Sequence, residues 1–146
     1  MQPMVNIALR AARQAGEMIV KAADNLESVE VSEKSKNDFV TEIDKRSEQI
    51  IIGSILKAYP DHHFLSEERG FDGNNSSDVQ WIIDPLDGTT NFVRGIPYVS
   101  VSIACMIKGK LEHAVVLEPF SHDEFTASRG FGAKLNGRRI RVSGKT

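Results

Sequence analysis

The N-terminal residues carry apolar side chains at the spacing of one helical face. Between residues 4 and 22 apolar positions recur every three or four residues, and arginine, glutamine, glutamate and lysine occupy the opposite face. Pro3 suits a first helical turn, where its missing N–H costs nothing. The pattern predicts a long amphipathic helix over residues 4–22. Its apolar stripe consists of Met4, Ile7, Ala8, Ala11, Ala15, Met18, Ile19 and Ala22.

A second helix is predicted to begin near Thr41. Thr41 and Asp44 have the spacing of a capping box, in which the two side chains satisfy free N–H groups of the first turn. The helix should end at Tyr59, because a residue that precedes a proline avoids the helical region. The buried side of this helix is expected to comprise Ile43, Ser47, Ile50, Ile51, Leu56 and Tyr59.

Strand patterns dominate the rest of the chain. Lys108–Lys110 is a turn between two alternating strands, and Asn136-Gly137 is a strong signal for a two-residue hairpin. Residues 32–38 and 70–78 are polar or turn-forming and are predicted to be loops. The strands are predicted at residues 29–31, 63–65, 79–83, 99–107, 111–117, 125–128, 134–135 and 138–142. Two helices followed by several antiparallel strands predict an α+β fold, with two long helices packed on a mainly antiparallel sheet.

The composition is that of one globular domain over residues 1–146. Apolar residues make up 40% and charged residues 26% of the chain. A net charge of -2 argues against a dedicated nucleic-acid or polybasic membrane protein, although a local basic patch remains compatible with it. The single cysteine, Cys105, excludes an internal disulfide and a cysteine-rich zinc site. With no apolar run of the ~20 residues that span a bilayer and no cleavable leader, we expect a cytoplasmic protein without membrane association.

The segment Trp81–Phe92 carries the most informative chemistry. An apolar strand leads to Asp84, and Asp87 follows three residues later, so a tight turn can aim both carboxylates at one point. The carbonyl of Leu86 lies between them without a strand partner, and Gly88 allows an unusual backbone angle. The threonines that follow can open a short helix, whose free N–H groups attract an anion. Oxygen ligands beside anion donors suit phosphate chemistry assisted by Mg²⁺, which takes one or two carboxylates together with phosphate oxygens and waters.

Further carboxylates precede this segment. Glu67 and Glu68 end a predicted strand, and Asp38 and Asp44 flank the start of the second helix. If they converge, a cation must offset their repulsion, and a metal pair ~3.5–4 Å apart can activate a water and hold the leaving oxygen. The alternatives are a surface turn for the Asp-Pro-x-Asp-Gly sequence, a solvated pair for Glu67 and Glu68, and a helix cap for Asp44.

The C-terminal residues are strongly basic. After Glu124 there is no acidic residue. The basic residues that follow it are Arg129, Lys134, Arg138, Arg139, Arg141 and Lys145. One interpretation is a phosphate-rich partner such as RNA. The other is an edge hairpin that positive charge protects from pairing with another chain, and these residues taken alone favour it.

Three ordered motifs resemble the inositol monophosphatase family of Mg²⁺-dependent, lithium-sensitive phosphatases. They are Asp38-Phe-Val-Thr-x-x-Asp44, Ser66-Glu67-Glu68 and Trp81-Ile-Ile-Asp84-Pro-Leu-Asp87-Gly-Thr-Thr-Asn-Phe92. The resemblance runs from the first helix to about Val142. It implies the metal-binding N-terminal subdomain of a layered αβαβα phosphatase fold. We expect the C-terminal subdomain, with its Trp-Asp-x-x-Ala-Gly-like motif, to be absent from this chain.

The resemblance also implies metal and substrate roles for the matching residues. Glu67, Asp84 and the carbonyl of Leu86 would hold a first Mg²⁺, and Asp84 and Asp87 a second. Glu67 and Thr89 would orient the attacking water, without a covalent phosphoenzyme. Backbone N–H groups of Gly88 and Thr89 would hold the phosphate. The implied substrate contacts are Glu67, Leu86, Asp87, Gly88 and Thr89.

In addition to these two Mg²⁺ sites, the resemblance implies a third, more weakly bound metal ion and two alternative classes of function. Lys34 or Lys36 would belong to a mobile loop near that metal, with Asp44 bracing it as part of the catalytic group. The implied activity is hydrolysis of inositol 1-phosphate with two or three Mg²⁺ ions, inhibited by Li⁺. Bacterial members imply the alternative, a non-catalytic factor in ribosomal RNA transcription antitermination that binds RNA polymerase, Nus factors or RNA. Family members commonly form homodimers.

Overall fold

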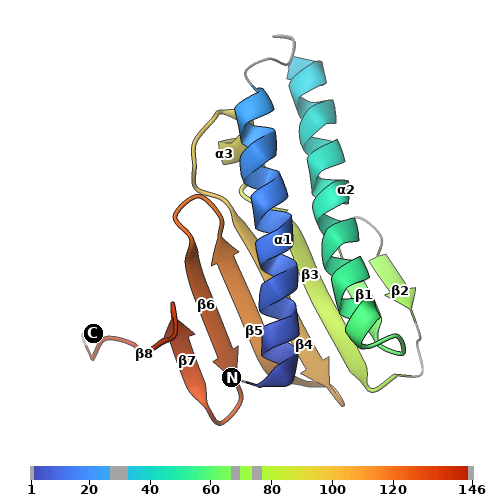
Figure 1. Ribbon diagram of the computed structural model, residues 1–146, viewed down its shortest axis with the longest axis vertical. Helices are drawn as coiled ribbons and strands as arrows, with labels where there is room; N and C mark the ends of the chain where they lie inside the picture. Colours follow the sequence, from blue (N-terminus) through green and yellow to red (C-terminus); the bar gives the residue numbers. More distant parts are fainter. Residues whose placement is uncertain (1, 27–32, 67–69, 74–76, 145–146) are drawn as a thin grey trace.

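The computed structural model describes residues 2–26, 33–66, 70–73 and 77–144. Within these residues two long helices lie side by side across one face of an eight-stranded sheet (Figure 1). The elements in chain order are α1 (Pro3–Leu26), α2 (Glu33–Ala58), β1 (His63–Ser66), β2 (Gly70–Gly73), β3 (Val79–Asp87), α3 (Thr89–Val93), β4 (Ser100–Ile107), β5 (Lys110–Glu118), β6 (Asp123–Ser128), β7 (Gly132–Leu135) and β8 (Arg138–Ile140). The predicted α+β architecture is confirmed.

The first helix follows its predicted apolar stripe. Its buried face is rich in alanine, which lets the helix lie close to α2 and to the sheet. Gly16 allows a close approach to the end of β5, since a Cβ there would lie 2.9 Å from Cδ2 of Leu117 and 3.1 Å from Cβ of Pro119. Neither α1 nor any other helix in the described ranges is long and apolar enough to cross a bilayer.

The second helix begins at Glu33, not near Thr41, so the predicted capping box and the predicted loop over residues 33–38 are wrong. Thr41 lies inside α2, where its Oγ1 donates a hydrogen bond to the carbonyl of Asn37 at 2.9 Å. Lys34 and Lys36 occupy the first turn of α2 and not a loop. The physical reason is that no glycine or proline interrupts residues 33–41, so the helix extends toward the N-terminus. The strand predicted at residues 29–31 lies outside the described residues.

The sheet is mainly antiparallel, as predicted. Its strand order is β2-β1-β3-β4-β5-β6-β7-β8, and only β1 and β3 run parallel among the described strands. The predicted loop over residues 70–78 is wrong in its first part, because Gly70–Gly73 pairs with β1. Pairing with a strand already in the sheet supplies hydrogen-bond partners that outweigh the turn preference of this sequence.

The two long helices cover one face of the sheet and leave the other face uncovered. The face under α1 and α2 holds most of the buried strand residues: Phe64, Trp81, Ile83, Val101, Ile103, Cys105, Val115 and Leu117. Alternate residues on the same strands point to the other face, and both long helices lie away from it (Figure 1). The parallel strands β1 and β3 point toward the same end of the sheet, and β3 leads directly into α3.

Candidate functional site

The carboxyl end of β3 carries an irregularity between two aspartates. Asp84 pairs with Ser102 and Asp87 with Ser100, so Pro85 and Leu86 fall outside the regular ladder. Both residues of this bulge are buried, Asp84 is half-buried with a buried Oδ1, and Asp87 is exposed. Leu86 lies outside the paired register, in a segment flanked by two carboxylates.

Two adjacent residues of α2 hold the ends of the strands that border this site. Ser47 is fully buried and its Oγ donates a hydrogen bond to the carbonyl of Pro85 at 2.7 Å. Glu48 is 1% exposed and accepts a hydrogen bond from the hydroxyl of Ser66, the last residue of β1. One turn of helix therefore fixes both the end of β1 and the bulge of β3.

Glu48 was missed by sequence reasoning, although its position gives a signal. It lies four residues after Asp44 and three before Ile51, which places a carboxylate within the buried stripe of α2. An acid in such a stripe needs a polar partner, because burial of a carboxylate without one is costly. Ser66 supplies that partner.

Gly88 connects the strand to α3 in a conformation that favours glycine. Its φ of 91° and ψ of 37° are left-handed, and its carbonyl accepts the N–H of Phe92 at 3.0 Å. A Cβ at this position would lie 2.9 Å from the carbonyl oxygen of Tyr98. The Nδ2 of Asn91 donates to the same Tyr98 carbonyl at 2.8 Å. The short helix predicted at Thr89 is confirmed as α3.

Asp44 and Thr89 come together across one polar hollow between α2 and α3. The hollow has a volume of about 430 Å³ and is also lined by Asn37, Thr41 and Arg94. These two candidate residues are 45 positions apart in the sequence (89 − 44) and meet only through the fold. Asp44 thus lines the same hollow as Thr89, and it does not cap α2, because the helix begins at Glu33.

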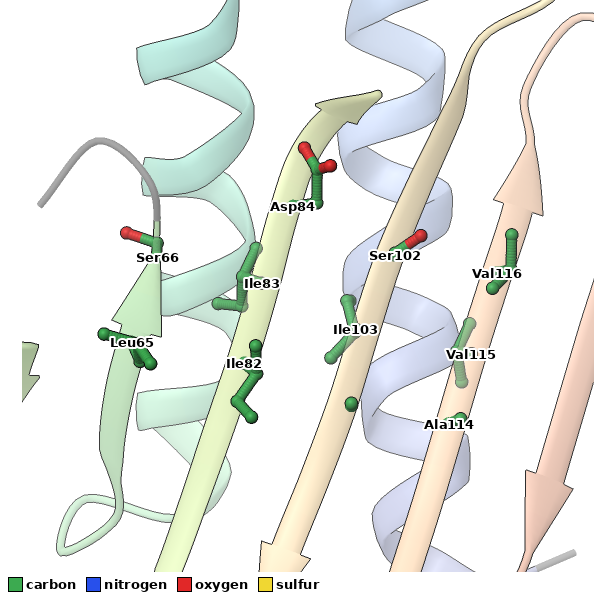
Figure 2. A pocket seen from close by; sticks show the side chains of 11 residues that line it. Leu65, Ser66, Ile82, Ile83, Asp84, Ser102, Ile103, Ala114, Val115 and Val116 are labelled. Carbon is green, nitrogen blue, oxygen red and sulfur yellow. The ribbon is translucent and has the colours of Figure 1, made fainter. Parts of the chain in front are cut away.

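Asp84 and Asp87 face different hollows. Asp87 and Gly88 line one of about 350 Å³ together with Ser100 and Glu118. Asp84 lines a shallow apolar one of about 460 Å³ on the uncovered face of the sheet. Figure 2 shows the Asp84 carboxylate at the end of β3, beyond Ile82 and Ile83, with Ser66 on the neighbouring strand.

One predicted metal ligand is not among the described residues. Glu67 and Glu68 lie outside the described residues. Among the residues that the structure does describe, no three His, Cys, Asp or Glu side chains lie close enough together to hold a metal ion. The oxygen atoms that are placed comprise two carboxylates and the carbonyl of Leu86, and hard oxygen donors of this kind suit Mg²⁺ better than a soft metal.

The single thiol is unsuited to nucleophilic chemistry. Cys105 is completely buried under the helices, as its place in an alternating strand indicates. Burial raises its pKa to about 12, and the charge of Glu112 contributes in the same direction. The side chain therefore remains a neutral thiol at physiological pH, and the chemistry of the site rests on oxygen groups.

Comparison with known proteins identifies the family to which this fold belongs. The model of the inositol monophosphatase family matches residues 1–146. The chain belongs to the inositol monophosphatase family. It is 57% identical to Nus factor SuhB of Pseudomonas aeruginosa, in an alignment that covers 99% of this chain and 54% of that protein. Nus factor SuhB of Escherichia coli strain K12 is 53% identical over 98% of this chain.

Solved structures of the family share the fold. The extragenic suppressor protein suhB from Bartonella henselae is 38% identical, with a TM-score of 0.87 over 99% of this chain and 56% of that one. The inositol monophosphatase from Anabaena is 35% identical, with a TM-score of 0.82 over 97% of this chain and 50% of that one. The chain spans about half the length of the relatives it matches.

Proposed function

We propose that this chain is the metal- and phosphate-binding part of a cytoplasmic Mg²⁺-dependent phosphomonoesterase that hydrolyses inositol 1-phosphate. The observation that carries the proposal is the bulge of β3, where Asp84 and Asp87 flank the Leu86 carbonyl and Gly88 opens α3. Membership of the inositol monophosphatase family supports the same assignment. In this proposal residues 1–146 form one subdomain. The protein forms a homodimer, as members of the family commonly do.

Different residues bind the metal ions, the phosphate and the attacking water. Asp84, the Leu86 carbonyl and Asp87 hold Mg²⁺ together with Glu67, and up to three ions act, with Li⁺ as an inhibitor. Bound Mg²⁺ supplies charge that offsets the phosphate and lowers the pKa of a water. Backbone N–H groups of Gly88 and of the next residue donate to the phosphate oxygens.

The hollow between α2 and α3 is the proposed site of water activation. The hydroxyl of Thr89 and the carboxylate of Glu67 orient the attacking water, and the Glu67 carboxylate accepts its proton. Asp44 lines the same hollow as Thr89. Lys34 and Lys36, in the first turn of α2, add positive charge at the start of the helix that carries Asp44. No covalent intermediate with the protein is required.

Thermal unfolding with and without Mg²⁺ tests the metal site. A ligand at 100 times its Kd stabilises the native state by about 2.7 kcal/mol, which raises Tm by roughly 5–11 °C for a chain of this size. We expect this Mg²⁺-dependent rise in Tm to disappear in Asp84→Asn and Asp87→Asn. It should persist in Asp61→Asn, which removes the same charge from an exposed turn after α2. An unchanged Tm for the unsubstituted chain in Mg²⁺ would overturn the site.

Phosphate release then tests the chemistry. We expect release from inositol 1-phosphate to require Mg²⁺ and to be weak or absent in the 146-residue chain, since about half of the length of its relatives is not represented. Measurable release that persists in excess chelator, or in Asp87→Asn, would contradict the assigned role of these carboxylates.

A second function is association with transcription factors. Relatives that are 52–57% identical over almost the whole chain are named Nus factor SuhB. We therefore propose, as the alternative to catalysis, a non-catalytic role in ribosomal RNA transcription antitermination, through RNA polymerase, Nus factors or RNA. Pull-down with purified RNA polymerase and Nus factors should succeed equally for the unsubstituted chain and for Asp84→Asn. Retention of neither factor by the unsubstituted chain would refute this role.

A further inference from the structure

A small hollow lies where the first turn of α1 meets strands β6 and β7. It has a volume of about 190 Å³ and is lined from the helix by Gln2 and Val5 and from the strands by Thr126, Ser128 and Lys134. Figure 1 shows the start of α1 at the end of the sheet opposite α3, so this hollow is separate from the candidate metal site. Pockets that take drug-sized ligands measure about 300–1,000 Å³. The hollow therefore suits a ligand of only a few atoms.

The helix end at this hollow carries a positive partial charge that no acid of the first turn offsets. The first turn of α1 has no acidic residue, and the first acid in the helix is Glu17. Because Pro3 has no N–H, the first backbone donors of α1 are those of Met4 and Val5, which have no acceptor within the helix. Free N–H groups at a helix N-terminus attract anions. A helix end alone does not make a binding site, so the side chains that line the hollow are decisive.

Thr126 brings a nearly buried hydroxyl group to the hollow. Its side chain is 8% exposed, and its hydroxyl forms no hydrogen bond with any residue that the structure describes. Buried hydroxyl groups without a partner are rare, because the loss of hydration costs free energy. Ser128 follows two residues later on the same face of β6, and its Oγ lies 2.9 Å from Nδ1 of His113. When that nitrogen carries the proton, the serine hydroxyl is free to donate into the hollow. A ligand with acceptor atoms would satisfy both hydroxyl groups.

Lys134 supplies a full positive charge. It lies on β7 between Thr126 of β6 and Arg139 of β8, in one row across the sheet. Lys134 and Arg139 have no ion pair with any residue in the described ranges, and like charges directly opposite one another destabilise a sheet. Protection of an exposed edge does not account for Lys134, because β7 is paired on both sides, with β6 and with β8. An anion beside Lys134 would turn the repulsion into attraction.

We propose that this hollow binds free inorganic phosphate, a small tetrahedral oxyanion. The ammonium of Lys134 and the hydroxyls of Thr126 and Ser128 approach from two strands, and the N–H groups of the first turn approach from α1. Donors on several sides suit an anion with four acceptor oxygens better than a planar carboxylate, and hydrogen bonds to an ionised acceptor are the stronger ones. Lys134 and Arg139 together match the charge of a phosphate dianion. The site requires no Mg²⁺ and depends on neither of the functions proposed above.

Isothermal titration calorimetry of the 146-residue chain with inorganic phosphate tests the proposal, in excess chelator and at constant ionic strength. The chelator removes the Mg²⁺ that the proposed catalytic site needs to bind its own phosphate. We expect saturable binding with a Kd below about 10 mM, and binding of acetate that is weaker by about 10-fold or more. Lys134→Gln and Thr126→Val each remove one hydrogen bond to a charged group, so each should weaken phosphate binding by about 10-fold to 150-fold.

Arg138→Gln is the matched control for charge. Arg138 is the neighbour of Arg139 on β8, so its side chain lies on the opposite face of the sheet from Lys134. Arg138→Gln should therefore leave the affinity for phosphate unchanged. Arg139→Gln removes an exposed charge on the same face as Lys134 and should weaken binding by up to about 5-fold.

Thermal unfolding separates a ligand site from a structural role. In the absence of phosphate, Thr126→Val should not lower Tm, because the hydroxyl bonds to no described residue and valine favours strands. Lys134→Gln should not lower Tm either, because it relieves the repulsion from Arg139. Phosphate should raise the Tm of the unsubstituted chain and of Arg138→Gln, and it should raise the Tm of neither Thr126→Val nor Lys134→Gln.

Five results would overturn the proposal. They are no saturable binding of phosphate, equal affinity for acetate, tighter binding of glycerol phosphate than of free phosphate, equal losses of affinity in Arg138→Gln and Lys134→Gln, and a lowered Tm of Thr126→Val without phosphate. The third result would assign the hollow to a phosphate ester, the fourth would assign the binding to the general positive charge of the hairpin, and the fifth would give the Thr126 hydroxyl a role in the fold. Since all of these measurements are made without Mg²⁺, none of them bears on the candidate metal site.

Discussion

Substitution of Gly88 by alanine tests the geometry of the candidate site most directly. At this residue the chain leaves β3, passes the Asp87 carboxylate and enters α3. Its left-handed backbone costs an L-residue about 1–2 kcal/mol. A Cβ would in addition lie 2.9 Å from the carbonyl oxygen of Tyr98, a backbone atom that cannot rotate away. Relief of such overpacking costs about 1–3 kcal/mol more.

Gly95→Ala is a matched control for the free-energy cost of placing alanine in a left-handed backbone conformation. It is also left-handed, with a φ of 73°, and a Cβ there would meet nothing within 4 Å. Gly95→Ala should therefore cost only about 1–2 kcal/mol, against about 2–5 kcal/mol for Gly88→Ala. Alanine also lowers the conformational entropy of the unfolded chain, which stabilises the native state by about 0.4–1 kcal/mol. This stabilisation is the same for both substitutions and cancels when their free energies of unfolding are compared.

Urea unfolding of the two variants measures this difference. Gly88→Ala should also weaken the Mg²⁺-dependent rise in Tm, because relief of the contact with Tyr98 must move the backbone beside Asp87, whereas Gly95→Ala should retain that rise. Equal free energies of unfolding in the two variants would refute the close approach. A full Mg²⁺ response in Gly88→Ala would show that this turn does not position the metal ligands.

Three further outcomes are expected. Ser47→Ala leaves the buried Pro85 carbonyl without its donor and should lower the free energy of unfolding by about 1–3 kcal/mol in urea titrations. Gly16→Ala should destabilise in spite of the usual helical preference for alanine, since the added methyl group meets the residues at and just after the end of β5; a rise in Tm would contradict this packing. Burial lowers the pKa of His62, whose Nδ1 accepts the Trp81 N–H at 3.0 Å. Because that pKa is lowered from 6.5, stability should be complete above pH 6.5 and decline as the pH falls through the folded-state pKa, and His62→Gln should flatten this profile.

The helices and most strands could be predicted because local pattern and packing agree. The stripe of α1, the stop at Pro60 and the Asn136-Gly137 turn each reflect a constraint contained in a few neighbouring residues. The start of α2 and the pairing of β2 could not be predicted in this way. A polar sequence without glycine or proline is neutral between helix and loop, and a glycine-bounded segment becomes a strand only because β1 lies beside it.

The difference between local and long-range constraints also explains which parts of the candidate site could be predicted. Asp84, Asp87 and Gly88 lie within five residues at the end of β3, so their spacing alone predicts a shared chemical role. The meeting of Asp44 with Thr89 depends on how α2 lies against α3, and no local pattern contains that information.

Ser47 and Glu48 provide the physical link between the fold and the site. They belong to the buried stripe that packs α2 on the sheet, and through Pro85 and Ser66 they also fix the two strand ends. A displacement of α2 would therefore move the bulge, the end of β1 and Asp44 together. The position of the candidate ligands is consequently a property of helix packing, and substitutions along the α2 interface should alter Mg²⁺ affinity even where they touch no ligand.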